Sequence, residues 1–208
     1  MIYKFFHILL ILILSSLLIA EKDHTSLLVY GDSISAGYGM GDDKQWSEEL
    51  KKILIEEKIN IKIINKSLSG ETTGGGLSRL KNIINSAQPS YILIELGGND
   101  ALRGYPPAKI KKNIKAMIQL AENNGVQALL MQIRILPNYG KRYQTSFESI
   151  YKEIAEENNI PLIPFMLNDI ALEKKLMLDD GIHPNEQAQP LIASFIFQNL
   201  IPLINNLN

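Results

Sequence analysis

The sequence contains no cysteine and only three histidines among its 208 residues. The absence of cysteine excludes disulfide bonds, thiol nucleophiles and thiolate metal ligands. His7 lies in an apolar N-terminal segment and His24 just after it, so a histidine base inside the folded domain can only be His183. One candidate histidine and no thiolate also argue against a zinc site. We therefore expect no metal and no cofactor, and we interpret the acidic pair Asp42-Asp43 as solvated.

The sequence also lacks an excess of charge of either sign. It has 21 Lys and Arg against 22 Asp and Glu, and no repeat or low-complexity linker divides it. A near-neutral chain with mixed charges is not expected to bind nucleic acid, or to dock on anionic lipid through its charge. We expect a single domain over residues 21–208 that acts on a small molecule as a monomer.

Residues 1–20 form an apolar segment with one early cation, Lys4. This pattern is typical of a secretory signal peptide, so we expect cleavage after Ala20 and export to the periplasm or the exterior. The alternative is an uncleaved anchor, because the segment is near the short limit for a membrane span and Leu18 is not the small residue usual near a cleavage site. With no cysteine near the site, a lipoprotein anchor is excluded.

Short apolar runs alternate with amphipathic stretches along the rest of the chain. We expect strands from Leu27 and from Tyr91, and at residues 61–65, 127–133 and 162–165. We expect helices at residues 46–58, 77–86, 109–124, 147–158 and 188–203. Alternation of this kind predicts right-handed βαβ units and a parallel sheet covered on both faces, which is a three-layer α/β/α sandwich.

The first strand runs into the polar turn Gly31-Asp32-Ser33. Ligands of open α/β sheets bind beyond the carboxyl ends of the strands, which is where Ser33 would lie as a nucleophile. The alternative is that Asp32 and Ser33 are ordinary turn or helix-capping residues. Ser35 occupies the last position of a Gly-x-Ser-x-Gly elbow, which disfavours an α/β-hydrolase.

The segment from Asp179 to Asn185 contains a carboxylate three residues before a histidine. A single turn can bring the carboxylate of Asp180 to one ring nitrogen of His183, which would fix the tautomer and leave the other nitrogen free to take a proton. A nucleophile, a base and an orienting acid are then available in Ser33, His183 and Asp180. The alternative is a capped turn with a solvated histidine.

Two further strand ends carry small or amide residues. Asn99 follows the strand from Tyr91, and its side-chain N–H could stabilise a developing oxyanion. Gly70 follows the strand at residues 61–65 and would let the backbone approach a ligand closely. The cluster Gly74-Gly75-Gly76 lacks the spacing of a phosphate-binding loop, and we interpret it as a flexible turn before a helix.

Taken together, the blocks around Ser33, Gly70, Asn99 and His183 resemble the SGNH, or GDSL-type, serine hydrolases, a family with a flavodoxin-like sandwich. The resemblance covers the whole chain after residue 20 and is strongest to its bacterial periplasmic multifunctional acyl hydrolases. It implies Ser33, Asp180 and His183 as the catalytic residues, and Ser33, Gly70 and Asn99 as the oxyanion donors. Two departures are Ile34, where Leu is common, and the proline of Ile135-Leu136-Pro137, which stands one place late and bears on acyl-chain preference.

The resemblance implies hydrolysis of fatty acyl thioesters, lysophospholipids and small aryl or alkyl esters through an acyl-serine. The alternatives are a carbohydrate O-acetylesterase using the same residues, and a non-catalytic binding module of the same fold. Loops after the third and fourth strands could line an apolar groove for the acyl chain, or could be packing surface. The candidate groove residues are Leu102, Tyr105, Ile135, Leu136, Pro137 and Tyr139.

Overall fold

The computed structural model describes residues 25–135 and 137–206, so the expected signal peptide and Leu136 lie outside the described residues. A five-stranded parallel sheet forms the centre, in the order β2-β1-β3-β4-β5. Its strands are β1 (Thr25–Gly31), β2 (Ile61–Asn65), β3 (Tyr91–Glu95), β4 (Gln127–Met131) and β5 (Leu162–Ile163). The expectation of a parallel sheet is confirmed.

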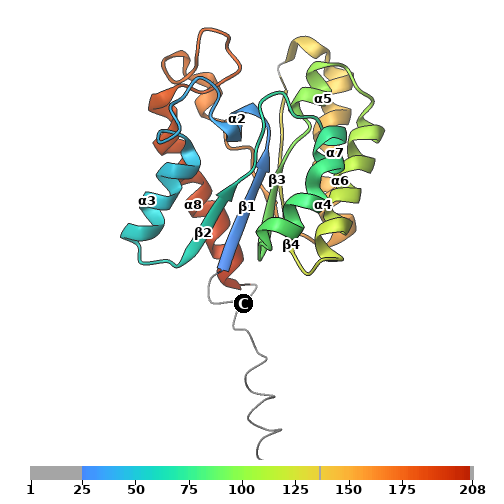
Figure 1. Cartoon of the computed structure of the whole chain (residues 1–208). Helices are drawn as coiled ribbons and strands as arrows, with labels where there is room; N and C mark the ends of the chain where they lie inside the picture. Colours follow the sequence, from blue (N-terminus) through green and yellow to red (C-terminus); the bar gives the residue numbers. More distant parts are fainter. Residues whose placement is uncertain (1–24, 136, 207–208) are drawn as a thin grey trace, which may run out of the picture.

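Helices cover both faces of this sheet (Figure 1). On one side lie α3 (Trp46–Glu56) and α8 (Gln189–Asn206), which pack against each other. On the other side lie α4 (Thr73–Ala87), α6 (Pro107–Glu122) and α7 (Lys141–Asn158), with α6 packed between the other two. The molecule is therefore the three-layer α/β/α sandwich that the alternation predicts.

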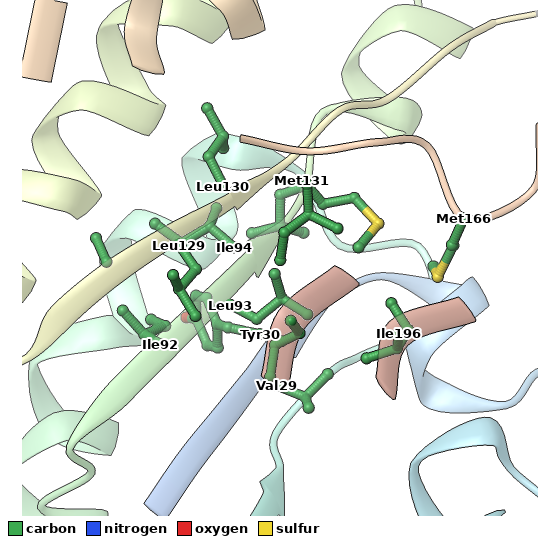
Figure 2. Packing of buried hydrophobic residues seen from close by; sticks show 14 of the residues in the cluster. Val29, Tyr30, Ile92, Leu93, Ile94, Leu129, Leu130, Met131, Met166 and Ile196 are labelled. Carbon is green, nitrogen blue, oxygen red and sulfur yellow. The ribbon is translucent and has the colours of Figure 1, made fainter. Parts of the chain in front are cut away.

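Strand β1 occupies the interior of the sheet and is apolar on both faces. Leu27 pairs with Ile63 of β2 on one side and with Tyr91 of β3 on the other. The side chains of residues 27–30 are fully buried, as expected for a strand covered by helices on both faces. Figure 2 shows Val29 and Tyr30 of this strand in one cluster with Leu93 and Ile94 of the adjacent β3 and Leu129 of β4 beyond it. This packing fixes the position of the chain that follows β1.

Several details differ from the sequence-based expectations. Helix α7 begins at Lys141 rather than at residue 147, and β4 and β5 end at Met131 and Ile163, two residues earlier than expected. The short helices α2 (Ser33–Ala36) and α5 (Gly98–Leu102) were not expected. Both directly follow strands, and four or five residues are too few to show helical periodicity.

The interpretation of Gly74-Gly75-Gly76 as a flexible turn is wrong. The three glycines lie at the start of α4, whose N-cap Thr72 accepts a hydrogen bond from the Gly75 N–H at 3.2 Å. The Tyr30 hydroxyl donates to the Gly76 carbonyl at 2.6 Å, and Leu96 leaves no room for a side chain at Gly76. Close packing of the helix on the sheet therefore explains a glycine at this position.

Among residues 25–135 and 137–206, the structure contains no helix that is both long enough and apolar enough to cross a membrane.

Candidate active site

Ser33 is the first residue of α2, at the carboxyl end of β1. Asp32 is the N-cap of this helix, and its Oδ1 accepts a hydrogen bond from the Ile34 N–H at 3.1 Å. The helix ends after one turn at Gly37, which has a left-handed backbone with φ of 71°. This tight strand-to-helix turn holds the hydroxyl of Ser33 at the sheet edge, 2.8 Å from Nε2 of His183.

His183 and Asp180 lie together in the loop that precedes α8. The Nδ1 of His183 lies 2.6 Å from Oδ2 of Asp180, while Oδ1 of Asp180 accepts the backbone N–H groups of Ile182 and His183. Because an ionised carboxylate can only accept, it favours a proton on Nδ1 and leaves Nε2 free to accept from Ser33. The short spacing joins Asp180 to His183, and the fold brings Ser33, 150 positions away in sequence, into the same hydrogen-bonded chain.

The pKa of Asp180 reflects this bonding. Partial burial raises it, but the hydrogen bonds from the His183 N–H, the His183 ring and the Ile182 N–H outweigh burial and lower the pKa to about 2. Asp180 is therefore ionised at neutral pH. The ring of Tyr38 lies against the imidazole, with the ring centroids 4.3 Å apart, and covers one face of His183.

Gly70 and Asn99 line the same cleft as Ser33. Gly70 has a left-handed backbone with φ of 79°, and nothing lies within 4 Å of the position that a side chain would take. Asn99 lies in the first turn of α5, and its Nδ2 donates to Oδ2 of Asp32 at 3.1 Å. The Arg103 guanidinium donates to the carbonyl oxygens of both Gly70 and Asn99 at 3.3–3.4 Å and so links the two segments.

A pair of buried carboxyl groups forms the floor beneath Ser33. Oε2 of Glu95, at the end of β3, accepts the Ser35 hydroxyl at 2.7 Å and the Asp32 N–H at 3.4 Å. Burial raises the pKa of Glu95 well above its usual value, and the charge of Asp32 raises it further. Burial likewise raises the pKa of Asp32 to about 6, against the opposing hydrogen bonds from Ile34 and Asn99. Glu95 was not predicted as a site residue from the sequence, although a lone carboxyl in the apolar run 91–96 is a signal for it.

The cleft has a volume of about 490 Å³ and is mostly apolar. Of the candidate groove residues, Leu102 and Ile135 line the cleft. Tyr105 packs partly buried against the core, and the Tyr139 hydroxyl donates to the Leu102 carbonyl at 3.5 Å; neither lines the cleft. A further set of lining residues, not predicted from the sequence, follows β5. Its apolar residues are Phe165, Leu167, Ala171, Leu172, Met177 and Ile182.

Within residues 25–135 and 137–206, no three His, Cys, Asp or Glu side chains are grouped so that they could hold a metal ion. The side chains at the sheet edge instead offer a hydroxyl, an imidazole and a carboxylate in hydrogen-bonded sequence, beside a backbone N–H and an amide. This combination suits nucleophilic attack on a carbonyl carbon with stabilisation of the resulting oxyanion.

A parallel α/β/α sandwich with a Ser–His–Asp chain at the carboxyl edge of its sheet defines a class of serine hydrolase folds distinct from those with a Gly-x-Ser-x-Gly elbow. The profile of the GDSL-like lipase/acylhydrolase family matches residues 29–190. The chain belongs to this family.

Relatives with named activities are similar over most of the chain. An arylesterase of Vibrio mimicus is 45% identical over 182 residues, which cover 88% of this chain and 91% of the relative. The thioesterase 1/protease 1/lysophospholipase L1 of Escherichia coli (strain K12) is 41% identical over 183 residues, covering 87% and 86%. The crystal structure of the psychrotrophic esterase EstA from Pseudoalteromonas sp., inhibited by monoethylphosphonate, has a TM-score of 0.86 and 39% identity, covering 88% of this chain and all of that one.

Proposed function

We propose that the protein is a carboxylic ester hydrolase that cleaves acyl esters and thioesters through an acyl-serine intermediate on Ser33. The single observation that carries the proposal is the continuous chain from Ser33 Oγ to His183 Nε2 at 2.8 Å and from His183 Nδ1 to Asp180 at 2.6 Å. Family membership and relatives named as arylesterase and thioesterase support the same reaction.

In the proposed mechanism, His183 takes the proton of Ser33 as the serine oxygen attacks the carbonyl carbon. Asp180 holds the imidazole in the productive tautomer and stabilises the imidazolium that forms. His183 then gives the proton to the leaving alcohol or thiol, and water repeats the sequence to release the acid. The backbone N–H groups of Ser33 and Gly70 and the side chain of Asn99 are the proposed donors to the oxyanion.

The cleft supports an acyl group as the part of the substrate that is recognised. Its volume of about 490 Å³ lies within the range of about 300–1,000 Å³ typical of small-molecule sites. Apolar lining residues from different segments, including Leu102 and Ile135 from the loops after β3 and β4 and Phe165 and Met177 from the segment after β5, suit a hydrocarbon chain. Lysophospholipids and other acyl esters met after export are the substrates that we infer, with residues 1–20 as the export signal.

Hydrolysis of p-nitrophenyl esters from acetate to palmitate by the chain without residues 1–20 tests the function. We expect a medium- or long-chain optimum and loss of activity in Ser33→Ala, which keeps the fold because Ser33 is only partly buried. An acetate-only optimum would instead favour a carbohydrate O-acetylesterase. Full activity of Ser33→Ala would overturn the mechanism, and no activity of the unsubstituted chain would favour a binding module.

Export and assembly are tested separately. Expression of the full chain, followed by mass spectrometry of the product, is expected to give a new N-terminus at Glu21. An intact N-terminus on membrane-bound protein would instead support an uncleaved anchor. Analytical ultracentrifugation is expected to give the mass of a monomer.

A further inference from the structure

The carboxylate of Asp32 joins two parts of the site that come from different strands. Its Oδ1 accepts the Ile34 N–H and caps the turn that begins with Ser33, while its Oδ2 accepts Nδ2 of Asn99. The proposed mechanism gives Asp32 no role, although only 4% of the residue is exposed and it lines the cleft. A buried carboxylate in contact with both a nucleophile turn and an oxyanion donor calls for an explanation.

The explanation lies in the symmetry of an amide side chain. The oxygen and nitrogen of Asn99 are nearly equal in size, so packing alone does not decide which of them faces the cleft. The hydrogen-bond partner of the amide determines its orientation, because an ionised carboxylate accepts hydrogen bonds and cannot donate one. Asp32 therefore binds the NH₂ end of Asn99 through one hydrogen and leaves the second hydrogen of the same nitrogen for the cleft.

We propose that Asp32 is a positioning residue that holds the Asn99 amide with its N–H, rather than its carbonyl oxygen, toward the oxyanion. This inference rests on the proposed function, since it assigns a role within the same site. If the amide were turned over, its carbonyl oxygen would meet the negatively charged oxygen of the intermediate and would repel it.

The surroundings of Asp32 keep it in place. A side chain at Gly98 would come within 3.2 Å of Oδ2 of Asp32, and a side chain at Gly31 would collide with the carboxyl group of Glu95. Glycine at both positions leaves room for two adjacent carboxyl groups under Ser33. The Asp32 backbone N–H is also bonded to Glu95, so both the main chain and the side chain of Asp32 are fixed.

The charges around Asp32 determine whether it can act as an acceptor. The titratable groups that face it are Glu95 at the end of β3, Asp100 on α5, Tyr151 on α7 and His183 on the loop before α8. Glu95 is the more deeply buried of the two floor carboxyls, and burial raises its pKa well above the usual value, which favours the proton on Glu95. Asp32, with a pKa of about 6, is then ionised at pH 8.

The substitution Asp32→Asn separates positioning from capping. Asparagine caps helices about as well as aspartate, so the α2 turn is retained, but its amide can donate as well as accept. The Asn99 amide is then free to turn over, and we expect kcat at pH 8 to fall by about 100-fold with KM changed less than about threefold. Asp43→Asn removes the same charge from an exposed position and is the matched control.

The same substitution in an Asn99→Ala background gives the decisive comparison. If Asp32 acts through Asn99, Asp32→Asn lowers kcat no further once the amide is absent. An equal fold loss of kcat in both backgrounds, or wild-type kcat in Asp32→Asn, would overturn the inference. Either result leaves the proposed function intact, because that function is tested separately by the activity of Ser33→Ala.

A second measurement uses protein that retains Asp32, so the inference can still be tested if the Asp32→Asn variant does not fold. In ¹⁵N-labelled His183→Ala protein, where the imidazole cannot contribute, the side-chain NH₂ signal of Asn99 is expected to shift as Asp32 titrates. Comparison with the spectrum of the His183→Ala/Asn99→Ala variant identifies the signal. An Asn99 signal that stays constant from pH 8 to the acid limit of folding would also overturn the inference.

Discussion

Two carboxylates flank the Ser33 turn, and the regions that hold them differ in almost every physical respect. Asp32 lies in the buried floor, which is built from the ends of β1 and β3, and burial raises its pKa to about 6. Asp180 lies on the loop before α8 with its side chain 38% exposed, where backbone N–H groups outweigh burial and lower its pKa to about 2. The floor is held by the sheet, whereas the loop is held by its own short-range hydrogen bonds.

The same residue type thus occupies two opposite environments at one site, and the proposed roles of the two carboxylates differ accordingly. In the proposed mechanism, the loop carboxylate uses its charge to stabilise an imidazolium, and the surrounding hydrogen-bond donors favour its ionised form. In the proposed positioning role, the floor carboxylate acts as a hydrogen-bond acceptor, and burial disfavours its charged form. The two regions are therefore expected to respond differently to the same Asp→Asn substitution.

The largest effect is expected from Asp180→Asn. Asparagine can still accept the Ile182 and His183 N–H groups through its oxygen, but it cannot favour the Nδ1 proton of the imidazole or stabilise its cation. We expect kcat for a p-nitrophenyl ester to fall by about 10³- to 10⁴-fold. Asp179→Asn, at the exposed neighbouring position, is the control and should keep wild-type kcat. A loss below about tenfold would mean that His183 does not depend on Asp180.

Asn99→Ala is expected to have the next largest effect. It removes one donor from the proposed oxyanion site, and such a loss lowers kcat by about 100- to 1,000-fold. Steady-state kinetics should show the loss in kcat with little change in KM. Asn138→Ala, which alters an exposed asparagine, serves as the control. Unchanged kcat in Asn99→Ala would remove this side chain from the mechanism.

The buried charge of Asp32 is expected to lower the free energy of unfolding, whereas the charge of Asp180 on the loop is not. The folded-state pKa of Asp32 is raised above its unfolded value of 3.8, so the folded protein holds the proton more tightly. As pH rises from about 4 to about 6, the unfolded chain ionises first and folding loses roughly 3 kcal/mol at this group. Asp32→Asn should therefore raise the free energy of unfolding at pH 8 while it lowers activity.

Urea unfolding of the wild-type and Asp32→Asn proteins at several pH values checks this. We expect the difference in the free energy of unfolding to grow between about pH 4 and pH 6 and then to level off. Asp43→Asn, an exposed site, should give a flat difference. A difference for Asp32→Asn that does not change with pH would mean that Asp32 is not destabilised in the folded protein.

The smallest effect is expected from Asn185→Ala at the end of the loop. The Asn185 side chain accepts the Gln187 N–H at 3.0 Å and donates to the Lys175 carbonyl at 2.7 Å, so it ties both ends of the loop. Its removal should lower the free energy of unfolding by about 1–2 kcal/mol and kcat by less than about tenfold. Gln187→Ala, which keeps the backbone N–H, is the control. A loss of kcat as large as that in Asp180→Asn would show that the other hydrogen bonds of the loop do not hold His183 in place without Asn185.

The sequence was most informative where the structure depends on local pattern. Three features depend on a short stretch of sequence, and the structure places each as expected. They are the strand from Leu27, the strand at residues 61–65 and the contact between Asp180 and His183. The polar ends of parallel strands meet at one edge, so Ser33 and Asn99 could be brought together from topology alone.

What the sequence did not predict depends on contacts between distant segments. Asp32 was considered as a turn or capping residue, and it is the N-cap of α2, but its bond to Asn99 spans 67 positions of the sequence. The cleft wall from Phe165 to Met177 follows a two-residue strand and contains short 3-10 turns with no periodicity to detect. Gly76 could not be separated from a loop glycine without knowledge of the Tyr30 ring beside it.

The interior position of β1 has a consequence for how the chain acquires its structure. The apolar segment 27–30 is made early, yet its two pairing partners lie far along the chain, with Ile63 36 positions and Tyr91 64 positions after Leu27. Pairings at such separation close slowly, and an unpaired apolar strand is prone to associate with other chains in the meantime. Both edges of β1 can form their backbone hydrogen bonds only after β3 has been synthesised. The turn that carries Ser33 is therefore expected to form late in folding, so that hydrolytic activity on refolding should lag behind the recovery of helical circular dichroism.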